Sequence, residues 1–392
     1  MTQSTSSGTV LVRVVESDSE FAALASEWET LQKDATTTSV FASFDWQHLW
    51  WQSYHASGEG RSLKLLIASS GTTLVGILPL YLETVLIMRY PVRLVRFVGS
   101  GGDTFPDDLG PILAKGREAE AARALADAAM RILDWDVLLL TDMDPDCAFT
   151  AAIQMASKKA PLGFRSGRAE RIAFLTLPSS FDGWLQSLHR DRRYRVRKIR
   201  KQLNAAHPSA RFFVWSDPAT LDAGVDRFIH LHCKRWDSLG LPHGFSSPAY
   251  IAFHRAVMKA CFSRDRLRLY CLEVSGQIIA MYYFYKFRDR VYLMQSGFDP
   301  DFSDVKPGQV LLGHIVEHAI GEGHQVLDFL RGDHRYKDEL ATGERETIYV
   351  NAFRASIGGV VYRTRRQYLP ALKAMYVQAR KRIRPEPPKE TA

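Results

Sequence analysis

The chain has 392 residues, 46% of them hydrophobic and 11% aromatic, which excludes an intrinsically disordered protein and allows two globular units. Its net charge of +8 is concentrated in residues 190–201 and 363–384, so the rest of the chain is mildly acidic, unlike a uniformly basic nucleic-acid binder. The chain has four cysteines without a CxxC pattern, which predicts a reducing, cytoplasmic location and no disulfides. It has no apolar run of ~20 residues, so no transmembrane segment is predicted.

Apolar spacing in the first part of the chain predicts an α/β half over residues 10–165, after a disordered tail at 1–9. The predicted elements are a strand at 10–15, helices at 19–33 and 41–54, strands at 63–68, 73–81 and 92–98, a helix at 117–133 and a strand at 137–140.

A joint at 163–170 is predicted to lead into a second half over residues 166–357. Its predicted elements are a strand at 172–177, a long helix at 181–203, a strand at 211–215, helices at 219–239 and 248–262, three strands between 267 and 298, and a last strand at 348–353. A basic surface helix over 358–384 and a disordered tail at 385–392 are predicted to follow.

The stretch from 291 to 338 organises the second half. It reads as a strand, a polar turn, a helix that begins at Pro307-Gly308, a second strand and the charged segment RGDHRYKD. Residues 92–140 repeat this order, so the chain is predicted to contain two duplicated halves. Because the first copy has TDMDPD where the second has RGDHRYK, we interpret the first half as structural or substrate-binding and the second as catalytic.

The strings SGFDP, KPGQVLL and LDFLRGDHRYK, in this order, resemble those of GNAT-type acyltransferases of the branch linked to bacterial cellulose and exopolysaccharide biosynthesis. That branch is related to the Fem-type aminoacyl transferases, which contain two tandem GNAT-like halves. The resemblance is sharpest over residues 170–355 and weaker over 10–165. It implies an α/β (mixed α+β) fold of two tandem GNAT-like halves, each a central mixed sheet flanked by helices, with acyl-CoA as co-substrate. PGQVLL differs from the QxxGxG/A phosphate-binding pattern of ordinary GNAT enzymes.

The start of the helix at Pro307 is the candidate cofactor-binding site. A helix N-terminus offers unpaired backbone N–H groups and a dipole that favours anions, and Gly308 allows a ligand to approach the backbone closely. We therefore predict that Pro307, Gly308, Gln309 and Val310 bind the pyrophosphate of CoA. A plain turn before a helix is the alternative interpretation.

Ionisable residues at the end of the second strand of this stretch form the candidate catalytic site. Acyl transfer from a thioester needs a base, donors for an oxyanion and a proton for the leaving thiolate. Asp328 is the candidate base and Tyr336 the candidate acid, while Arg331 and Lys337 are candidates for holding a phosphate or carboxylate. Asp333 completes this set. The alternative is a turn held only by ion pairs.

Two further residues are candidates for substrate binding. Gln295, at the end of its strand, is a candidate partner of the acyl carbonyl or the acceptor. Arg192 falls on the apolar stripe of its helix, between Leu188 and Val196, so it either reaches inward to an anionic ligand or lies over the core with its head in water.

The basic segment 190–201 has three interpretations: a solvated face, a site for an anionic partner such as tRNA or a lipid surface, or the wall of a charged groove. No metal site is predicted. His314 and His318 are four residues apart on a helix, but core aliphatic residues lie between them and no third ligand follows.

The sequence thus predicts an acyltransferase that moves an acyl group from acyl-CoA to an amine or hydroxyl. The resemblance implies a sugar nucleotide, an exopolysaccharide precursor or an amino-acid-like molecule as the acceptor. A Fem-type transferase that uses aminoacyl-tRNA is the second hypothesis. The third is a binding or scaffold protein with a degenerate GNAT site.

Overall fold

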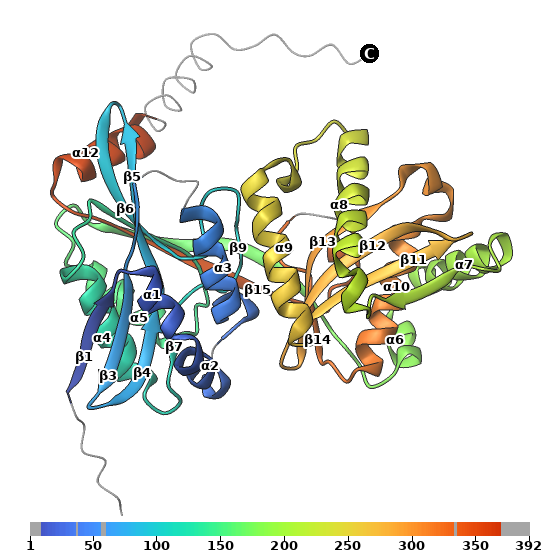
Figure 1. Ribbon diagram of the computed structural model, residues 1–392, viewed down its shortest axis with the longest axis horizontal. Helices are drawn as coiled ribbons and strands as arrows, with labels where there is room; N and C mark the ends of the chain where they lie inside the picture. Colours follow the sequence, from blue (N-terminus) through green and yellow to red (C-terminus); the bar gives the residue numbers. More distant parts are fainter. Residues whose placement is uncertain (1–8, 37, 56–59, 333–334, 370–392) are drawn as a thin grey trace, which may run out of the picture.

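The computed structural model of the chain describes residues 9–36, 38–55, 60–332 and 335–369. The first half, drawn in blue to green in Figure 1, contains β1 (Val10–Val15), α1 (Asp18–Ala23), α2 (Ala25–Asp34), η1 (Val40–Ala42), α3 (Phe44–His55), β2 (Arg61–Leu63), β3 (Leu65–Ser70), β4 (Thr73–Leu78), β5 (Leu80–Ile87), β6 (Tyr90–Phe97), β7 (Ile112–Leu113), α4 (Glu118–Arg131), β8 (Val137–Met143) and α5 (Ala148–Ser157).

The rest of the chain continues into the second half. Its elements are β9 (Phe164–Thr176), α6 (Phe181–Ser187), α7 (Arg190–Ala206), β10 (Arg211–Val214), η2 (Pro218–Thr220), α8 (Leu221–Ser238), η3 (Gly244–Ser246), α9 (Pro248–Ser263), β11 (Leu267–Val274), β12 (Gln277–Phe287), β13 (Arg290–Phe298), η4 (Pro300–Val305), α10 (Pro307–Gly321), β14 (Val326–Asp328), α11 (Arg335–Leu340), β15 (Gly343–Phe353), α12 (Ile357–Arg363) and η5 (Thr364–Tyr368).

One sheet runs through both halves. Its eleven strands have the order β10-β11-β12-β13-β14-β9-β15-β8-β6-β5-β2, and a separate four-stranded sheet of the first half has the order β1-β3-β4-β7. β14 pairs with the C-terminal end of β9, and β8 pairs with the C-terminal end of β15. The long antiparallel strands β9 and β15 therefore join the halves, and the predicted mixed α/β fold is confirmed.

Each half contains a strand, a helix and a second strand that is parallel to the first. β6 pairs with β8 and is connected to it through α4, while β13 pairs with β14 and is connected to it through α10. Parallel neighbours need such a crossover connection, and all other pairings among the described strands are antiparallel. The internal repeat expected from the sequence is thus visible as two equivalent units.

Several predicted segments differ from the structure. The helix expected at 19–33 is divided into α1 and α2, and the strand expected at 73–81 into β4 and β5. Of the joint expected at 163–170, residues 164–170 lie inside β9, because β15 supplies a hydrogen-bonding partner along that segment. The helix expected at 181–203 is divided into α6 and α7, since Leu188 has an extended backbone with ψ 144°. Of the basic helix expected at 358–384, the structure describes α12 and η5, whereas 370–384 lies outside the described residues.

The large sheet buries apolar side chains on both faces. In the second half, α6, α7 and α10 cover one face, where Phe284 and Leu293 are buried. The opposite face, under α8 and α9, belongs to a cluster that continues into the first half, and Phe41 packs edge-on against Tyr292 with ring centroids 5.8 Å apart. None of the described helices combines the length and hydropathy needed to cross a bilayer.

Candidate active site

The N-terminus of α10 is the first component of the site. Pro307 occupies the first helical position, where its missing N–H costs no hydrogen bond, and Lys306 precedes it in a left-handed conformation with φ 52°. The first turn contains no acidic residue and no side chain caps it. The N–H groups of Gln309 and Val310 both bond to the Lys306 carbonyl, at 3.0 and 3.2 Å, so among the predicted donors Gly308 is the one whose N–H is left for a ligand.

The loop before α10 is fixed by charged side chains of the scaffold. Asp299 accepts a hydrogen bond from the backbone N–H of Asp301 at 3.0 Å and thereby caps η4. Lys234 of α8 donates to Asp299 at 2.5 Å and to Asp301 at 2.6 Å. These contacts hold the segment that positions Lys306 and the start of α10.

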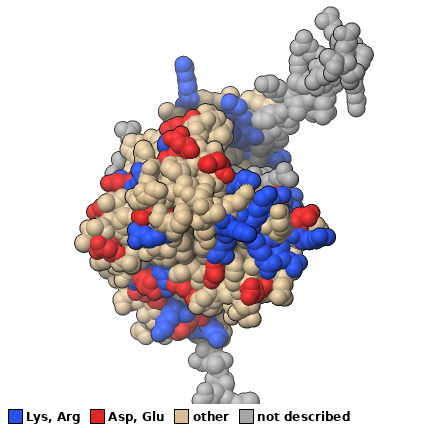
Figure 2. Space-filling view, turned by 90° about the vertical axis from the view of Figure 1, so that its right-hand side faces the viewer, with Lys and Arg blue, Asp and Glu red and all other residues tan. Residues whose placement is uncertain are grey.

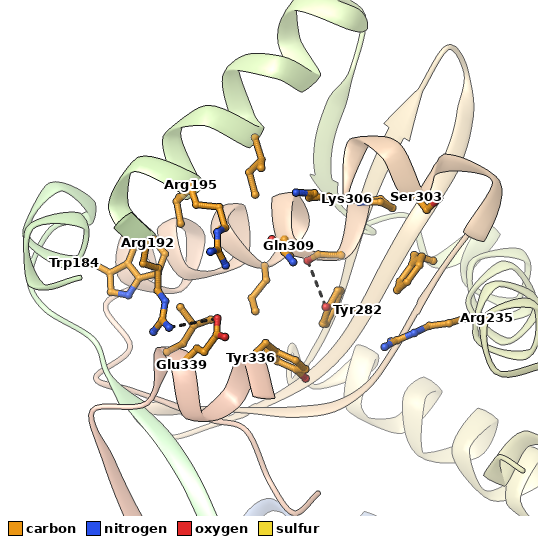
Figure 3. A pocket seen from close by; sticks show the side chains of 18 residues that line it. Trp184, Arg192, Arg195, Arg235, Tyr282, Ser303, Lys306, Gln309, Tyr336 and Glu339 are labelled. Atoms are coloured by element: carbon orange, nitrogen blue, oxygen red, sulfur yellow. Dashed lines mark hydrogen bonds and ion pairs between the residues drawn. The ribbon is translucent and has the colours of Figure 1, made fainter. Parts of the chain in front are cut away.

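A cavity of about 370 Å³ opens at this helix start (Figure 3). It lies between α7, α10 and α11, with β12 and β13 of the sheet beside it. Its apolar or aromatic lining residues are Trp184, Val196, Ile199, Tyr282, Phe298, Pro307, Leu312, Tyr336 and Leu340, and its other lining residues are Arg192, Arg195, Arg235, Ser303, Lys306, Gly308, Gln309, Gly313 and Glu339. A mostly apolar cavity with a few convergent charged groups is typical of a small-molecule site.

The charges of the lining favour an anion. Four cationic side chains contribute to it, and Glu339 is the single acidic one. Arg192 forms an ion pair with Glu339 at 3.3 Å, and Figure 3 shows Arg192 and Arg195 pointing from α7 into the cavity. Arg235 donates to the Ser296 hydroxyl at 3.1 Å and lies over the Phe298 ring, 4.6 Å from its centroid. Of the two interpretations of Arg192, the inward one agrees with this geometry.

Two tyrosines contribute hydroxyl groups to the cavity. The Tyr282 hydroxyl donates to the Gly308 carbonyl at 3.4 Å. Burial raises the pKa of Tyr336 above its ordinary value, with a further increase from Tyr282, and burial also raises the pKa of Tyr282. Both phenols therefore remain protonated near neutral pH and can donate hydrogen bonds.

Strand β13 separates from β14 beside the cavity. β13 continues to Phe298, but its pairing with β14 covers only Arg290 to Tyr292. A register shift between β12 and β13 leaves Met294 as an extra residue, because Tyr283 is opposite Gln295 and Phe284 is opposite Leu293. Beyond Tyr292, β13 has no paired strand on the side of β14 among the described residues, and Phe298 at its end lines the cavity.

Three predicted catalytic residues lie elsewhere, at the junction of the halves. Asp328 is fully buried, and its carboxylate accepts from Arg290 at 2.8 Å and from Arg345 at 3.0 Å. The Arg331 guanidinium donates to Asp107 at 3.0 Å and also binds Asp142.

Lys337 belongs to the same group, because it donates to the Leu330 and Arg331 carbonyls at 3.1 and 2.6 Å. None of Asp328, Arg331 and Lys337 lines the cavity. Asp328 and Lys337 thus hold neighbouring parts of the second half in place. Arg331 is the one of the three that binds carboxylates of the first half.

The carboxylates on the other side of this junction are strongly perturbed. Burial raises the pKa of Asp107 to about 7, although Arg331 opposes the effect. Burial likewise raises the pKa of Asp108 to about 6, against the opposing charge of Arg345, which it binds. Asp142 lies near the C-terminal end of β8, and Arg331 follows the C-terminal end of β14, so the two repeats meet at the ends of their corresponding strands.

The remaining predicted residues lie outside the cavity lining or outside the described part of the chain. Gln295 lies outside the lining and donates to the Tyr250 hydroxyl at 3.2 Å. Val310 is fully buried in the core, and Asp333 lies outside the described residues. His314 stacks on Phe212 at 5.1 Å between centroids, and the described residues contain no group of three or more metal-ligating side chains.

Sequence reasoning missed several of the lining side chains, above all Trp184, Arg195, Arg235, Lys306 and Glu339. Lys306 directly precedes the predicted helix start, and Arg195 lies one helical turn from Arg192, so both were within reach of a helix-face argument. Trp184, Arg235 and Glu339 come from α6, α8 and α11, and no local pattern connects them.

Comparison with known proteins agrees with this geometry. Residues 190–338 match the family described as acetyltransferase (GNAT) domain, a segment that includes the whole cavity lining except Trp184, Glu339 and Leu340. No curated protein sequence matches the chain.

Solved structures show the same fold at low identity. The chain resembles FemX with a TM-score of 0.61 and 13% identity, over 87% of this chain and 98% of that one. It also resembles a conserved protein of unknown function from Bacteroides thetaiotaomicron VPI-5482 (TM-score 0.53, 10% identity, 87% and 100% covered) and L-PGS from Bacillus licheniformis (0.50, 10%, 86% and 94%). Residues 190–338 are thus similar to the GNAT acetyltransferase domain, and the chain as a whole has a fold similar to that of FemX.

Proposed function

We propose that the protein transfers an acyl group from acyl-CoA to an amine or hydroxyl acceptor. The observation that carries this proposal is the start of α10, which has no acid in its first turn and opens on a cavity with four cationic side chains and one carboxylate. A helix N-terminus with added positive charge is suited to a pyrophosphate. This site lies in the segment that matches the GNAT acetyltransferase domain.

The donor is assigned to the helix-start end of the cavity. The Gly308 N–H, Lys306 and Arg195 would bind phosphate oxygens of CoA. The pantetheine arm would lie along the apolar wall toward Phe298, at the end of β13 that extends beyond the pairing with β14, where backbone N–H groups are suited to polarising the thioester carbonyl.

The acceptor is assigned to the end where α7 faces α11. We assign the Glu339 carboxylate as the base that takes the proton of the attacking amine or hydroxyl, with Arg192 orienting it at 3.3 Å. The acceptor atom bonds to the thioester carbon, the C–S bond breaks, and the thiolate takes a proton from the Tyr336 hydroxyl. The raised pKa of Tyr336 keeps its hydroxyl protonated until the thiolate forms, and the proton that Glu339 has taken from the acceptor then reprotonates the phenolate, so that the site returns to its starting state. Asp328, the base expected from the sequence, is not used in this scheme, because buried ion pairs occupy its carboxylate.

The finer assignment follows from the sequence strings given above. We infer a cytoplasmic enzyme of the branch linked to exopolysaccharide biosynthesis, with a saccharide or amino-acid-like acceptor. The transfer is to nitrogen or to oxygen, and an assay that offers both types of acceptor tests this.

Calorimetric titration of the purified chain with acetyl-CoA, a longer acyl-CoA and free CoA tests the donor site. Binding in the micromolar range is expected for the unchanged chain. Gly308→Glu places a carboxylate at the helix start and should weaken binding at least about tenfold, or ~1.4 kcal/mol. A Cβ at position 308 would meet Tyr282 at no less than 3.4 Å, so this variant is expected to fold.

The matched control is Gly321→Glu, at the opposite end of the same helix, where a Cβ would meet nothing within 4 Å. It adds the same charge and should leave CoA affinity unchanged. Equal binding by both variants, or no binding of any CoA species to the unchanged chain, would refute the donor site.

A second candidate function rests on the outer face of α7. Four cationic side chains of this helix are exposed and do not line the cavity, namely Arg190, Arg197, Lys198 and Lys201, and Lys and Arg side chains gather in a band on this side of the molecule (Figure 2). Such a face suits RNA phosphates, which favours an aminoacyl-tRNA donor. Electrophoretic mobility shifts with aminoacyl-tRNA, lost in Arg197→Gln/Lys198→Gln, would support it. Absence of both CoA and tRNA binding would leave the non-enzymatic binding protein.

A further inference from the structure

The end of the first half that is formed by the β5–β6 hairpin and α12 exposes many large apolar side chains. Of the twelve that are strongly exposed in the described residues, five lie here: Leu86, Met88, Ile357, Val360 and Leu369. Leu86 is 77% exposed, Ile357 65% and Met88 63%. Exposed apolar side chains that gather at one end of a protein mark a surface that binds something apolar.

The backbone of the hairpin explains why two of these side chains point outward. Met88 and Arg89 connect the strands and both have positive φ, 52° and 66°, as in a tight two-residue hairpin turn. Side chains alternate along β5, so Ile87 is buried while Leu86 and Met88 on either side of it are exposed.

Helix α12 packs beside this hairpin, on β6, and adds a second apolar edge (Figure 1). Val361 and Tyr362 contact the cluster that contains Ile87. Ile357 and Val360, which are one helical turn apart, remain 65% and 51% exposed, so they lie on the side of the helix away from that cluster.

Cationic side chains lie between these apolar ones. Arg89 is exposed at the hairpin tip, and Arg365 and Arg366 are exposed in η5. No acidic residue occurs between 357 and 369. The sequence from 370 to 384 adds five more Lys and Arg residues and again no acid. The nearby Asp136 is already bound by Arg93 and Ser356.

We propose that this end of the protein docks on the surface of an anionic lipid bilayer. Leu86, Met88, Ile357 and Val360 insert at the boundary between headgroups and acyl chains, and Arg89, Arg365 and Arg366 face lipid phosphates. A fluid bilayer accommodates separate apolar protrusions, whereas a protein partner would need a matching pocket for each. The positive charge between the protrusions selects anionic lipid. This docking is peripheral, and it does not depend on the proposed acyl transfer.

Flotation of the full chain with lipid vesicles tests the proposal. Vesicles of phosphatidylcholine with about one third phosphatidylglycerol should bind the chain roughly tenfold more strongly than pure phosphatidylcholine, and high salt should weaken the binding. Leu86→Ser/Met88→Ser should lower binding to the anionic vesicles roughly tenfold, since two inserted side chains are lost. Its control is Leu11→Ser, which changes a side chain on β1 that is 70% exposed and should bind unchanged.

A second pair of variants tests the charge. Arg365→Gln/Arg366→Gln should weaken binding to the anionic vesicles, whereas Arg197→Gln/Lys198→Gln on α7 removes equal charge from the rival basic surface and should have little effect. Equal binding to both vesicle types, no binding to either, or loss only in the α7 variant would overturn the proposal. So would a dimer of the free chain in sedimentation velocity that Leu86→Ser/Met88→Ser dissociates, because the surface would then join two copies.

Discussion

Helices α4 and α10 hold equivalent places in the two halves, but their N-termini are chemically opposite. α10 begins without an acidic residue and opens on a cavity with four cationic side chains. α4 begins with Glu118 and Glu120, which bind Thr36 and Arg117 respectively. The protein's own carboxylates therefore occupy, at α4, the position that we assign to a ligand's phosphates at α10.

This difference separates what the fold provides from what the side chains add. Both helices have a dipole that favours negative charge at the N-terminus. In the first half, two glutamates already satisfy that preference, and the unit serves the scaffold. In the second half the preference is left open and Lys306, Arg192 and Arg195 strengthen it. The charge of the first turn is what distinguishes a binding unit from a structural one.

The largest effect is expected where the two halves are joined. The N-termini of α4 and α10 can be compared only if both halves are folded together, and this junction holds them. Arg331→Met leaves Asp107 and Asp142 buried without their partner and should lower the free energy of unfolding by about 3–5 kcal/mol. Urea denaturation measures this. Arg165→Met, at an exposed position of β9, is the control and should change it by at most about 0.5 kcal/mol. A loss below about 1 kcal/mol for Arg331→Met would show that the junction contributes little.

The same junction should make stability depend on pH. Burial raises the folded-state pKa of Asp107 to about 7, whereas an aspartate in the unfolded chain has a pKa of about 3.9. Asp107 then binds a proton in the folded chain but not in the unfolded chain between these values, so its contribution to stability is greatest below about pH 4 and falls as pH rises to about 7, by up to about 1 kcal/mol per unit. Asp107→Asn should flatten this slope in unfolding experiments at several pH values. The same dependence on pH in Asp107→Asn and in the unchanged chain would contradict the assignment.

A smaller effect tests the open N-terminus itself. Arg195→Gln removes one of the four cations of the cavity and should weaken acyl-CoA binding roughly tenfold, with a shallower salt dependence. Arg197→Gln on the same helix removes an exposed charge that does not line the cavity and provides the comparison. Calorimetry at two salt concentrations would separate them. Equal losses would mean that the charge of α7 acts only at long range.

The smallest effect is expected at α4. Glu118→Gln with Glu120→Gln removes the carboxylates that complement the helix dipole and should lower the free energy of unfolding by about 0.3–1 kcal/mol. Thermal or urea unfolding measures the loss, and the affinity for acyl-CoA should not change. A change in that affinity would place ligand binding in the first half and reverse the comparison.

Local patterns were enough to predict the scaffold of the site. Pro307-Gly308 after a polar turn fixes where α10 begins, and alternating apolar residues give the strands around it. The same kind of reasoning gave an inward orientation of Arg192 as one of two interpretations, and its side chain lines the cavity.

The role of the charged segment after β14 could not be predicted from local sequence patterns. Arg331 forms an ion pair with Asp107, which is 224 residues away in the sequence, and Asp328 forms one with Arg345, which is 17 residues away. A dense group of ionisable residues after a strand looks the same in sequence whether it serves catalysis or joins two halves. Only the packing of the halves reveals which carboxylates face Arg331.

The shared strands β9 and β15 have a consequence for the order in which the protein is made. β15 emerges from the ribosome after nearly all of both halves, yet it is the neighbour of β8 in one and of β9 in the other. Until it arrives, both strands expose an unpaired edge. Neither half can complete its sheet during synthesis, so nascent chains and fragments that end before Gly343 are expected to need chaperone protection against aggregation.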